Sequence, residues 1–489
     1  YGDHRDLHRL IRRQRQMCIR DRIYITIHGG VNEIGGNKIL LEDKGHDVKV
    51  FLDFGKSFKA ISKYYQFPFH RPQTISELIE IGAIPLIENL YSVEVEKRKN
   101  FDFSRDPEPP IQGVVVSHGH MDHVGHITLL SRRTRIYMGY CCHKIFNAYG
   151  KVSRAYSVDT IFDGIEHNIC DFRTGDIVRI GELEIKPIHV DHSIPGAYGF
   201  IVFTSEGPII YTGDFRLHGS TGLTEDFINA IEDLRYDTRI LCLITEATHI
   251  DFSGYVSEDE VERKLSELFS RIKGNIIADF SRTDIDRFFS FLYAAKRTGR
   301  KLVIDWKRYI IIREILEAGL KRKYTVKDFE VDPDILVIAK EKERYYYLEE
   351  KKLFERLPED KKITSSEIAK RDDLIIVLST RSTSALAEIG FPRSCVYIMA
   401  SSEPFSEESE ITFEKVKNWL EILGVPIYYI HASGHIQPLD LREFINRVQP
   451  RIVIPVHSEK PLLLKNFIRK FKWIIPTKGE KIKIGSSKL

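Results

Sequence analysis

The sequence predicts an α/β protein in which one α/β unit is inserted into a second unit that is rich in short strands. Three observations support this fold class. Short β-branched runs separated by Gly-rich turns fill the first half of the chain, and strands alternate with amphipathic helices from about residue 240. Short strands return after residue 425. With 489 residues, 42% hydrophobic and 29% charged, the chain can form two or three cores, which excludes collagen-like, low-complexity and wholly disordered classes.

In the first unit, β-branched residues bounded by glycines or other turn residues predict short strands. We expect these strands at residues 23–27, 38–41, 48–53, 111–117, 184–190, 199–204 and 208–211. Residues 56–110 interrupt this pattern with many aromatic residues and prolines. We therefore expect an irregular insertion there, packed beside a cleft.

In the inserted unit, amphipathic helices at 258–272 and 284–296 alternate with buried-looking strands, which predicts a parallel sheet. We expect those strands at residues 240–245, 275–280, 301–305, 335–339, 374–379 and 395–399. The charged stretch 340–362 is typical of a solvated helix face. Strands at 426–430 and 451–456 then resume the first unit. The expected domain limits are residues 23–235 and 426–489 for the first unit and 236–425 for the insertion.

The net charge of +3 is unevenly distributed. Residues 1–22 hold seven Arg and three Asp, so the 66 basic and 67 acidic side chains of the remainder give −1. We interpret residues 1–22 as a non-native or disordered segment. Because the body is not basic overall, any affinity for nucleic acid must come from a local groove. The six cysteines show no CxxC spacing and no disulfide framework, so we expect a cytoplasmic protein. No apolar run reaches the ~18 residues of a membrane span, so we expect no such span.

The strongest chemical signal is the sequence His118-Gly-His120-Met-Asp122-His123. It places four ligand-type side chains on one tight loop that follows a predicted strand. Imidazole and carboxylate groups suit zinc, and no structural role requires this density of such groups. The sequence therefore predicts a metal site here. His126 lies one helical turn from His123, and its role is left open between support of the ligands and packing.

The segment HGHMDH resembles the HxHxDH signature of the metallo-β-lactamase fold, an αββα sandwich whose sites hold two zinc ions. Other motifs of that fold occur here in the same order. The resemblance implies that Asp53, in VFLDFG, orients the ligand loop without binding metal. It identifies His192 in VDHSIPG, in preference to His189, as the next metal ligand. Asp214 in YTGDFR resembles the carboxylate that bridges both metals.

The inserted α/β unit resembles that of β-CASP nucleases. Glu246 in LITEATH is similar to the acidic motif at their domain junction, and His435 in HASGH and His457 in PVHSE are similar to their late histidine motifs. Together with HSIP and TGDF, these segments most resemble the ribonuclease J-like members. The expected fold is thus a metallo-β-lactamase αββα sandwich with an inserted β-CASP α/β domain.

This resemblance implies a zinc-dependent ribonuclease, a 5′-3′ exonuclease, an endonuclease or both, that hydrolyses RNA phosphodiester bonds with a hydroxide activated by two metals. Asp122 and Asp214 are then catalytic as well as metal ligands, and Mn²⁺ is an expected substitute for Zn²⁺. His435 is expected to protonate the leaving 3′ oxygen, with Glu246 orienting its ring. We assign the first metal to His118, His120 and His192, and the second to Asp122, His123 and His457, with Asp214 bridging.

The implied partner is single-stranded RNA bound between the two units, and a homodimer is compatible with the sequence. The expected contacts to the RNA backbone are Arg282, Ser379, Arg381 and Ser382. Two alternatives belong to other classes: a DNA-acting β-CASP nuclease and a catalytically inactive RNA-processing scaffold. In the family, DNA-acting members typically carry Val at the position that resembles His457, and inactive scaffolds have lost metal ligands. Both features favour the RNA-cleaving hypothesis.

Overall fold

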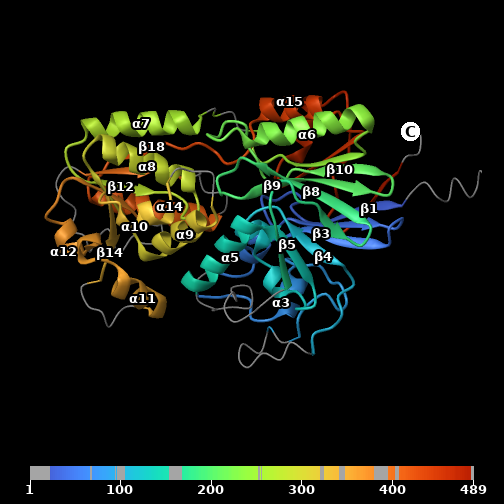
Figure 1. Ribbon diagram of the computed structural model, residues 1–489, viewed down its shortest axis with the longest axis horizontal. Helices are drawn as coiled ribbons and strands as arrows, with labels where there is room; N and C mark the ends of the chain where they lie inside the picture. The colour runs from blue at the N-terminus through green and yellow to red at the C-terminus, as the bar shows by residue number, and fades with distance from the viewer. Residues whose placement is uncertain are drawn as a thin grey trace, which may run out of the picture.

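The computed structural model describes residues 22–66, 69–93, 95, 105–153, 168–251, 254, 256–319, 324–340, 347–378, 395–401 and 407–485. Apart from Arg22, the segment 1–22 lies outside the described residues, as do Ser379, Arg381 and Ser382. Three seven-stranded sheets organise the described chain in two lobes (Figure 1). No helix in these ranges is both long and apolar enough to cross a membrane.

The first sheet has the order β21-β1-β2-β3-β4-β5-β6. It is antiparallel from β21 to β3 and parallel from β3 to β6. Its strands are β1 (Ile23–Gly29), β2 (Lys38–Asp43), β3 (Val48–Phe54), β4 (Gly113–Val116), β5 (Arg135–Gly139), β6 (Asn168–Phe172) and β21 (Lys481–Ile484). The C-terminal strand therefore closes the sheet that the N-terminal strand begins.

The second sheet has the order β20-β19-β11-β10-β9-β8-β7. It is parallel from β20 to β10 and antiparallel from β10 to β7. Its strands are β7 (Val178–Ile180), β8 (Leu183–Val190), β9 (Ala197–Thr204), β10 (Gly207–Tyr211), β11 (Cys242–Glu246), β19 (Ile452–Val456) and β20 (Lys472–Trp473).

The two sheets stack face to face around one apolar core, and helices cover their outer faces. Alternate residues of each strand, such as Ile25 and Ile209, fill the space between the sheets. The first sheet is covered by α2 (Phe58–Ser62), α3 (Ile75–Glu80), α4 (Met121–Val124), η3 (Ile127–Leu129) and α5 (Tyr140–Val152). The second is covered by α6 (Leu223–Asp237), α15 (Pro438–Val448) and η7 (Pro461–Asn466). This is the predicted αββα sandwich.

The third sheet forms the inserted unit, and every pair of neighbouring strands in it is parallel, as predicted. Its order is β15-β14-β13-β16-β12-β17-β18, from β12 (Ile276–Asp279), β13 (Lys301–Ile304), β14 (Ile335–Ile338), β15 (Lys362–Ile363), β16 (Leu374–Val377), β17 (Val396–Met399) and β18 (Ile427–Tyr429). Apolar clusters lie on both faces of this sheet, which is typical of parallel sheets.

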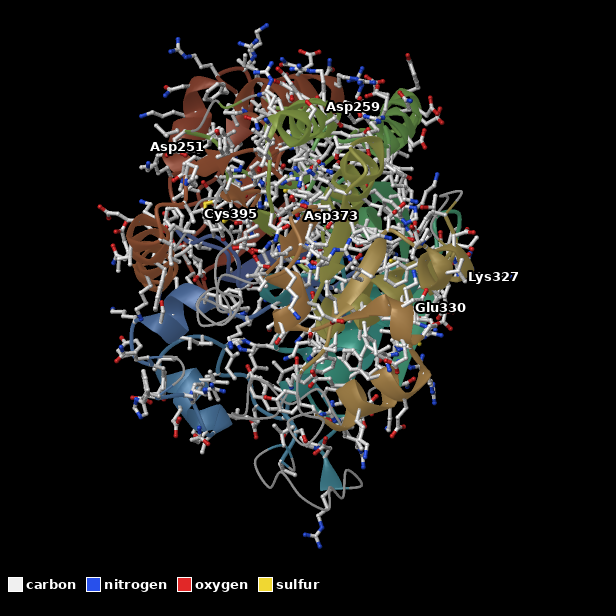
Figure 2. The ribbon with its side chains drawn as sticks, turned by 90° about the vertical axis from the view of Figure 1, so that its left-hand side faces the viewer. Asp251, Asp259, Lys327, Glu330, Asp373 and Cys395 are labelled. Atoms are coloured by element: carbon white, nitrogen blue, oxygen red, sulfur yellow. The ribbon has the colours of Figure 1, made fainter. Side chains whose placement is uncertain are left out.

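Helices cover both faces of the third sheet. They are α7 (Glu258–Arg271), α8 (Ile285–Arg297), α9 (Trp306–Glu317), α10 (Val326–Val331), α11 (Leu348–Arg356), η6 (Glu359–Lys361), α12 (Ser365–Ile368) and α14 (Glu407–Ile422). Figure 2 shows Lys327 and Glu330 on α10 and, apart from them, Asp259 on α7, so charges of both signs occur on this side. Helix α5 of the sandwich packs against α9, which joins the two units (Figure 1).

Two strands lie in a different sheet from the one predicted. The strand predicted at 240–245 is β11, which belongs to the second sandwich sheet because it pairs in parallel with β10 and β19. The strand predicted at 426–430 is β18, which pairs with β17 at the edge of the inserted sheet. Apolar strands look alike in sequence, whereas their partners are chosen by the surrounding fold. We therefore propose limits near residues 247 and 430 for the inserted unit.

Candidate metal centre and active site

The candidate site lies where the carboxyl ends of parallel strands from both sandwich sheets meet. In the first sheet, Asp53 lies near the end of β3 and His118 follows β4, its parallel neighbour. The chain then turns into the short helix α4, with His120 as its N-cap residue. The carboxyl edge of parallel strands is the usual position of ligand sites in α/β folds.

The second sheet supplies its residues in the same way. Asp214 follows β10, Glu246 ends β11 and His457 follows β19, and these three strands are adjacent and parallel. The register pairs Glu246 with Val456, which places His457 beside the end of β11. The reassignment of β11 to the sandwich thus explains why Glu246 reaches the site.

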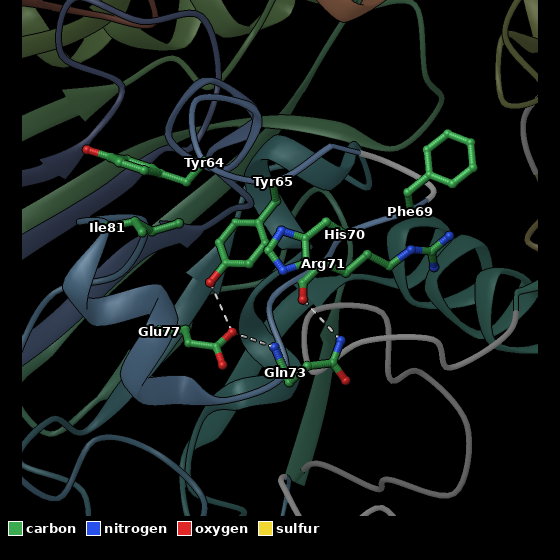
Figure 3. A pocket seen from close by; sticks show the side chains of 8 residues that line it. All are labelled: Tyr64, Tyr65, Phe69, His70, Arg71, Gln73, Glu77 and Ile81. Atoms are coloured by element: carbon green, nitrogen blue, oxygen red, sulfur yellow. Dashed lines mark hydrogen bonds between the residues drawn. The ribbon is translucent and has the colours of Figure 1, made fainter.

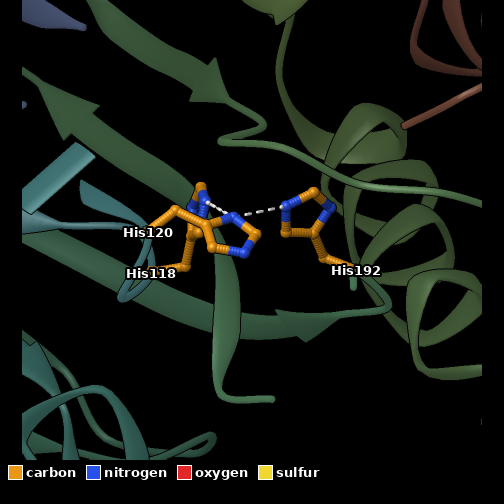
Figure 4. A group of neighbouring side chains, drawn as sticks. All are labelled: His118, His120 and His192. Carbon is orange, nitrogen blue, oxygen red and sulfur yellow. Dashed lines mark hydrogen bonds between the residues drawn. The ribbon is translucent and has the colours of Figure 1, made fainter. Parts of the chain in front are cut away.

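The first cluster contains three imidazoles, from His118, His120 and His192 (Figure 4). His120 Nδ1 lies 3.1 Å from His118 Nε2 and 3.1 Å from His192 Nε2. His192 Nδ1 donates to the Gly434 carbonyl at 2.5 Å, which leaves its Nε2 lone pair directed into the cluster. Burial, assisted by the neighbouring imidazoles, lowers the pKa of His118 and His192 well below the usual value and that of His120 to about 4. The cluster is therefore neutral and rich in lone pairs.

The second cluster contains Asp122, His123, Asp214 and His457. Asp214 Oδ2 lies 3.1 Å from His123 Nε2 and 3.5 Å from His457 Nε2, and also 3.8 Å from His118 Nε2 in the first cluster. Asp122 Oδ2 lies 3.1 Å from His457 Nε2. Asp214 is thus the carboxylate common to both clusters, the position predicted for a bridging ligand.

The hydrogen bonds around the second cluster leave buried donor atoms positioned to bind a cation. His123 Nδ1 donates to Asp53 Oδ2 at 2.7 Å, so the neutral ring turns a lone pair on Nε2 toward the carboxylate of Asp214. His123 Nε2 and Asp214 Oδ1 are buried without a hydrogen-bond partner. Burial disfavours charge on His123, yet Asp214, Asp53 and Asp122 raise its pKa well above the usual value. Either a proton or a metal ion must supply the positive charge, and imidazole with carboxylate suits zinc.

Asp53 fixes the orientation of these ligands through four hydrogen bonds. Its Oδ1 accepts from the Ser117 amide at 2.6 Å. Its Oδ2 accepts from Ser117 Oγ at 2.7 Å, from Tyr211 Oη at 2.6 Å and from His123 Nδ1. Asp53 is fully buried with a φ of 60°, and His457 has a φ of 55°, values that are uncommon outside glycine. Such backbone strain is found at functional sites when the surroundings hold it in place.

Two glycines allow the ligand loop to pack closely. A Cβ atom on Gly55 would lie 1.6 Å from the Asp122 carbonyl oxygen. A Cβ atom on Gly434 would lie 2.9 Å from His192 Cε1. The glycines of VFLDFG and HASGH are therefore required by the close approach of the metal-binding residues.

His435 and Glu246 form a separate pair beside the two clusters. His435 Nδ1 lies 2.8 Å from Glu246 Oε2 and 3.7 Å from Asp214 Oδ2. Glu246 also accepts from the Phe215 amide at 2.8 Å and from Thr248 Oγ1 at 2.6 Å. Burial opposes protonation of His435, but the carboxylates of Glu246, Asp214 and Asp122 together outweigh it and raise the pKa to about 9. The pair can thus hold a proton next to the clusters.

The loop that carries His435 is tied to both units by Ser433. His249 Nε2 lies 2.6 Å from Ser433 Oγ, which accepts from the His435 amide at 3.1 Å. His218 Nε2 and Arg216 bind the Ser433 carbonyl at 2.9 Å and 3.2 Å. These contacts hold the main chain of the loop while leaving the His435 side chain partly exposed.

Arg216 extends this connection into the inserted unit. Its guanidinium pairs with Asp191 at 2.9 Å, Glu258 at 2.9 Å and Asp286 at 3.0 Å. Arg287 of α8 binds the same Glu258 at 3.1 Å, and both arginines are fully buried. This buried ion network spans the junction between the sandwich and the inserted unit.

The remaining predicted residues lie elsewhere. Arg282 is in the inserted unit, where its Nε donates to the carboxylate of Asp305 at 3.2 Å. His189 stacks on Tyr198 with its Nδ1 3.0 Å from Thr174 Oγ1, outside both clusters. His126 is fully buried on the far side of the loop, with burial lowering its pKa well below the usual value.

Four residues that support the site were not singled out by the sequence reasoning. They are Ser117, Tyr211, Thr248 and Ser433. Tyr211, Thr248 and Ser433 lie inside the motifs YTGDFR, LITEATH and HASGH, and Ser117 precedes HGHMDH, so this position in sequence was the available signal. Their partners across long sequence separations, such as Asp53 for Tyr211, are specified by no local pattern.

Comparisons with known proteins agree with this architecture. Residues 92–234 match the model of a beta-lactamase superfamily domain, and residues 421–480 match that of a Zn-dependent metallo-hydrolase RNA specificity domain. A crystal structure of a protein of unknown function from Enterococcus faecalis V583 has a TM-score of 0.71 at 20% identity. That match covers 94% of this chain and 99% of the other, and it supports the fold.

Several curated relatives are ribonucleases. Ribonuclease J of Thermus thermophilus is 25% identical over 406 residues, covering 76% of this chain and 61% of that protein. Ribonuclease J of Helicobacter pylori is 23% identical over 466 residues, and the match covers 89% of this chain and 56% of that protein. Ribonuclease J2 of Bacillus subtilis is 20% identical over 359 residues, and the match covers 71% of this chain and 59% of that protein. The chain thus spans less than two thirds of the length of these relatives.

The fold, the two domain matches and the similarity to ribonuclease J from several species lead to one assignment. The chain has a metallo-β-lactamase fold with an inserted α/β domain, and it is similar to β-CASP ribonucleases of the ribonuclease J type.

Proposed function

We propose that this protein is a metal-dependent ribonuclease that hydrolyses phosphodiester bonds of RNA. The observation that carries the proposal is the pair of donor clusters, with Asp214 of the second cluster 3.8 Å from His118 of the first and grouped also with His435 and Glu246. The match to an RNA specificity domain and the ribonuclease J relatives support RNA as the substrate.

The donor set supports two Zn²⁺ ions per chain. His118, His120 and His192 would hold the first ion, and Asp122, His123 and His457 the second, with Asp214 shared between them. Bound divalent metals supply two things: they lower the pKa of water, and they neutralise the charge that grows on the phosphate. Mn²⁺ is the expected substitute because sites built from imidazole and carboxylate are not strictly selective.

The chain's own residues would perform the proton transfer. His435 holds a proton on a ring that is partly exposed at the site, and Glu246 fixes the orientation of that ring from its Nδ1 side. We propose that His435 donates from Nε2 to the leaving 3′ oxygen, as a general acid. Thr248 links Glu246 to His457, so the acid and the metal-binding residues share one hydrogen-bond network.

The proposed partner is single-stranded RNA lying between the two units, where Arg282 of the inserted unit would contact the backbone. Arg282 retains partial exposure, so its pairing with Asp305 leaves it accessible to a phosphate. The described cysteines are free and mostly buried, which supports our proposal of a reducing, cytoplasmic site of action.

One set of reactions tests the proposal. RNA labelled at one end and carrying a 5′-monophosphate, 5′-triphosphate or 5′-hydroxyl is incubated with protein and Zn²⁺ or Mn²⁺, beside DNA of matched sequence. We expect RNA cleavage that stops on chelation and returns when metal is restored. Cleavage of DNA in preference to RNA would instead favour a DNA-acting nuclease, and no cleavage of either by metal-loaded protein would favour an inactive scaffold.

A further inference from the structure

The segment that follows strand β3 combines cations with exposed aromatic rings. Between Asp53 and Glu77 the chain has no acidic residue, and it carries four basic residues, Lys56, Lys59, Lys63 and Arg71. The body of the protein as a whole has balanced charge, so this run is a local basic feature. A positive stretch interleaved with aromatic residues is the pattern used to bind single-stranded nucleic acid.

Three aromatic rings of this segment are exposed to solvent, although large aromatic side chains usually pack in the protein interior. Phe58 is 47% exposed, Tyr64 54% and Phe69 86%. Lysines lie over two of them, with Lys56 Nζ 5.7 Å from the Phe58 ring centroid and Lys63 Nζ 5.4 Å from that of Tyr64. Clustered exposed apolar side chains in a folded protein indicate a binding surface.

Two of these rings, Tyr64 and Phe69, border a cavity of about 700 Å³, which we call the aromatic pocket (Figure 3). Tyr64, Tyr65, Phe69, His70, Arg71 and Glu77 line it. The Tyr65 and His70 rings face each other in Figure 3, with centroids 5.2 Å apart, while Phe69 stands apart on the opposite side. The volume falls in the range of about 300–1,000 Å³ that is typical of small-molecule sites, which is enough for a nucleotide.

The pocket is built around a fixed side chain. Tyr65 Oη donates to Glu77 Oε2 at 3.0 Å, and the same oxygen accepts from the Gln73 amide at 2.8 Å. Glu77 lies in α3, whose N-cap Thr74 accepts from the Glu77 amide. The Tyr65 ring is therefore held in position before any ligand arrives, which lowers the entropic cost of binding.

The pocket is also connected to the candidate active site. The Lys56 amide donates to the Met121 carbonyl at 2.8 Å, and Gly55 packs against Asp122. Helix α2 begins at Phe58 and ends at Ser62, just before Tyr64. At 1.5 Å per residue this helix spans only ~7 Å, so the pocket lies a short distance from the ligand loop.

We propose that the aromatic pocket binds an unpaired nucleotide of single-stranded RNA next to the cleavage site. A base stacks on one of the two exposed rings, that of Tyr64 or that of Phe69, which lie on opposite sides of the pocket (Figure 3), and Lys63 and Arg71 meet the adjoining phosphates. This proposal rests on the proposed ribonuclease function and adds the path that the RNA takes past α2 and the aromatic pocket. Stacking accepts every base, so the pocket gives affinity for unpaired RNA without sequence preference.

The test measures RNA affinity separately from cleavage. Unpaired, 2′-O-methylated RNA resists hydrolysis, and its binding to metal-loaded protein is followed by fluorescence anisotropy for a series of lengths. The double variant Tyr64→Ala/Phe69→Ala is expected to bind long RNA about 10- to 100-fold more weakly. The matched control is Tyr236→Ala, because Tyr236 is an 87% exposed aromatic residue on α6 and should not affect binding. Lys63→Met is expected to lower the salt dependence by ~0.7 in the log–log slope, which corresponds to one phosphate contact.

A positive readout supplements this loss. RNA containing 4-thiouridine should photo-crosslink to a peptide that includes Tyr64 or Phe69. Equal affinity of the double variant and the wild type, or crosslinks confined to other segments, would overturn the pocket even if the wild type cleaves RNA. Crosslinking and weakened binding by a protein that cleaves no RNA would support the pocket and remove the nuclease proposal. Protein that neither binds nor cleaves RNA would remove both.

Discussion

Replacing Asp53 with Asn tests whether hydrogen bonding behind His123 controls metal binding. Asn has the same size and tolerates the φ of 60° at this position. The Ser117 amide donates to Oδ1, so the amide oxygen is expected to remain there and the new NH₂ group to replace Oδ2. That position now accepts from His123 Nδ1 at 2.7 Å. The NH₂ group cannot accept, so the proton of His123 should move to Nε2, the atom that faces Asp214.

The size of the effect follows from the loss of this tautomer. Removing a hydrogen-bond partner behind a metal-binding histidine typically costs 10- to 100-fold in metal affinity, or about 1.4–2.8 kcal/mol. The variant also removes a carboxylate that helps to raise the pKa of His123. We expect the second metal to be weakened more, because His123 bonds directly to the Oδ2 atom that is replaced, whereas His118 is linked to that atom through Ser117 Oγ.

The assay is competition with a chelator, read as metal content per chain, with RNA cleavage measured at limiting and saturating Zn²⁺. Asp43→Asn is the matched control. Asp43 is equally buried on the neighbouring strand and accepts from the Gly45 amide at 2.9 Å and the Ser205 amide at 2.7 Å, away from both clusters. The control should lose thermal stability and keep its metals. Wild-type metal affinity in folded Asp53→Asn protein would refute the tautomer argument.

Three further predictions follow from the site and its surroundings. The His435→Ala variant is expected to keep both metals and its RNA affinity, while its single-turnover cleavage rate falls ~10²–10⁴-fold. The His457→Ala variant should instead lose the second metal. A metal-loaded and fully active His435→Ala protein would contradict the general-acid role. Arg216→Met leaves three buried carboxylates without their common partner and should cost about 3–5 kcal/mol of stability, against ~0–1 kcal/mol for the more exposed Arg447→Met, with melting temperatures deciding between them. Burial of Lys38 lowers its pKa more than the neighbouring Glu33 raises it, from 10.5 to about 7. Between these pH values the unfolded chain therefore binds more protons than the folded protein. The free energy of unfolding should therefore rise with pH in that window, by up to ~1.4 kcal/mol per pH unit, and the Lys38→Met variant should lack this rise. If denaturant titrations give the wild type and Lys38→Met the same dependence of stability on pH, the prediction is wrong.

The sequence alone predicted the candidate metal-binding loop and the class of fold. The motif HGHMDH can be recognised without tertiary information, because its donor residues lie in one short loop that follows an apolar strand. Helical periodicity and alternating strands likewise predicted the parallel inserted sheet, since each element's own pattern of burial is local. The elements at 258–272 and 284–296 appear as α7 and α8 within a residue or two at each end.

Only the tertiary structure decided which strands pair and which distant side chains meet. A buried strand such as β11 or β18 is apolar in either sheet, so its sequence carries no record of its neighbours. The supporting bonds of Asp53 to Tyr211 and of His192 to Gly434 join residues 158 and 242 positions apart. Long-range contacts of this kind arise when separate strands deliver their ends to one edge, and no local pattern encodes that meeting. The aromatic pocket has the same origin, because burial decides which rings of residues 56–77 remain exposed.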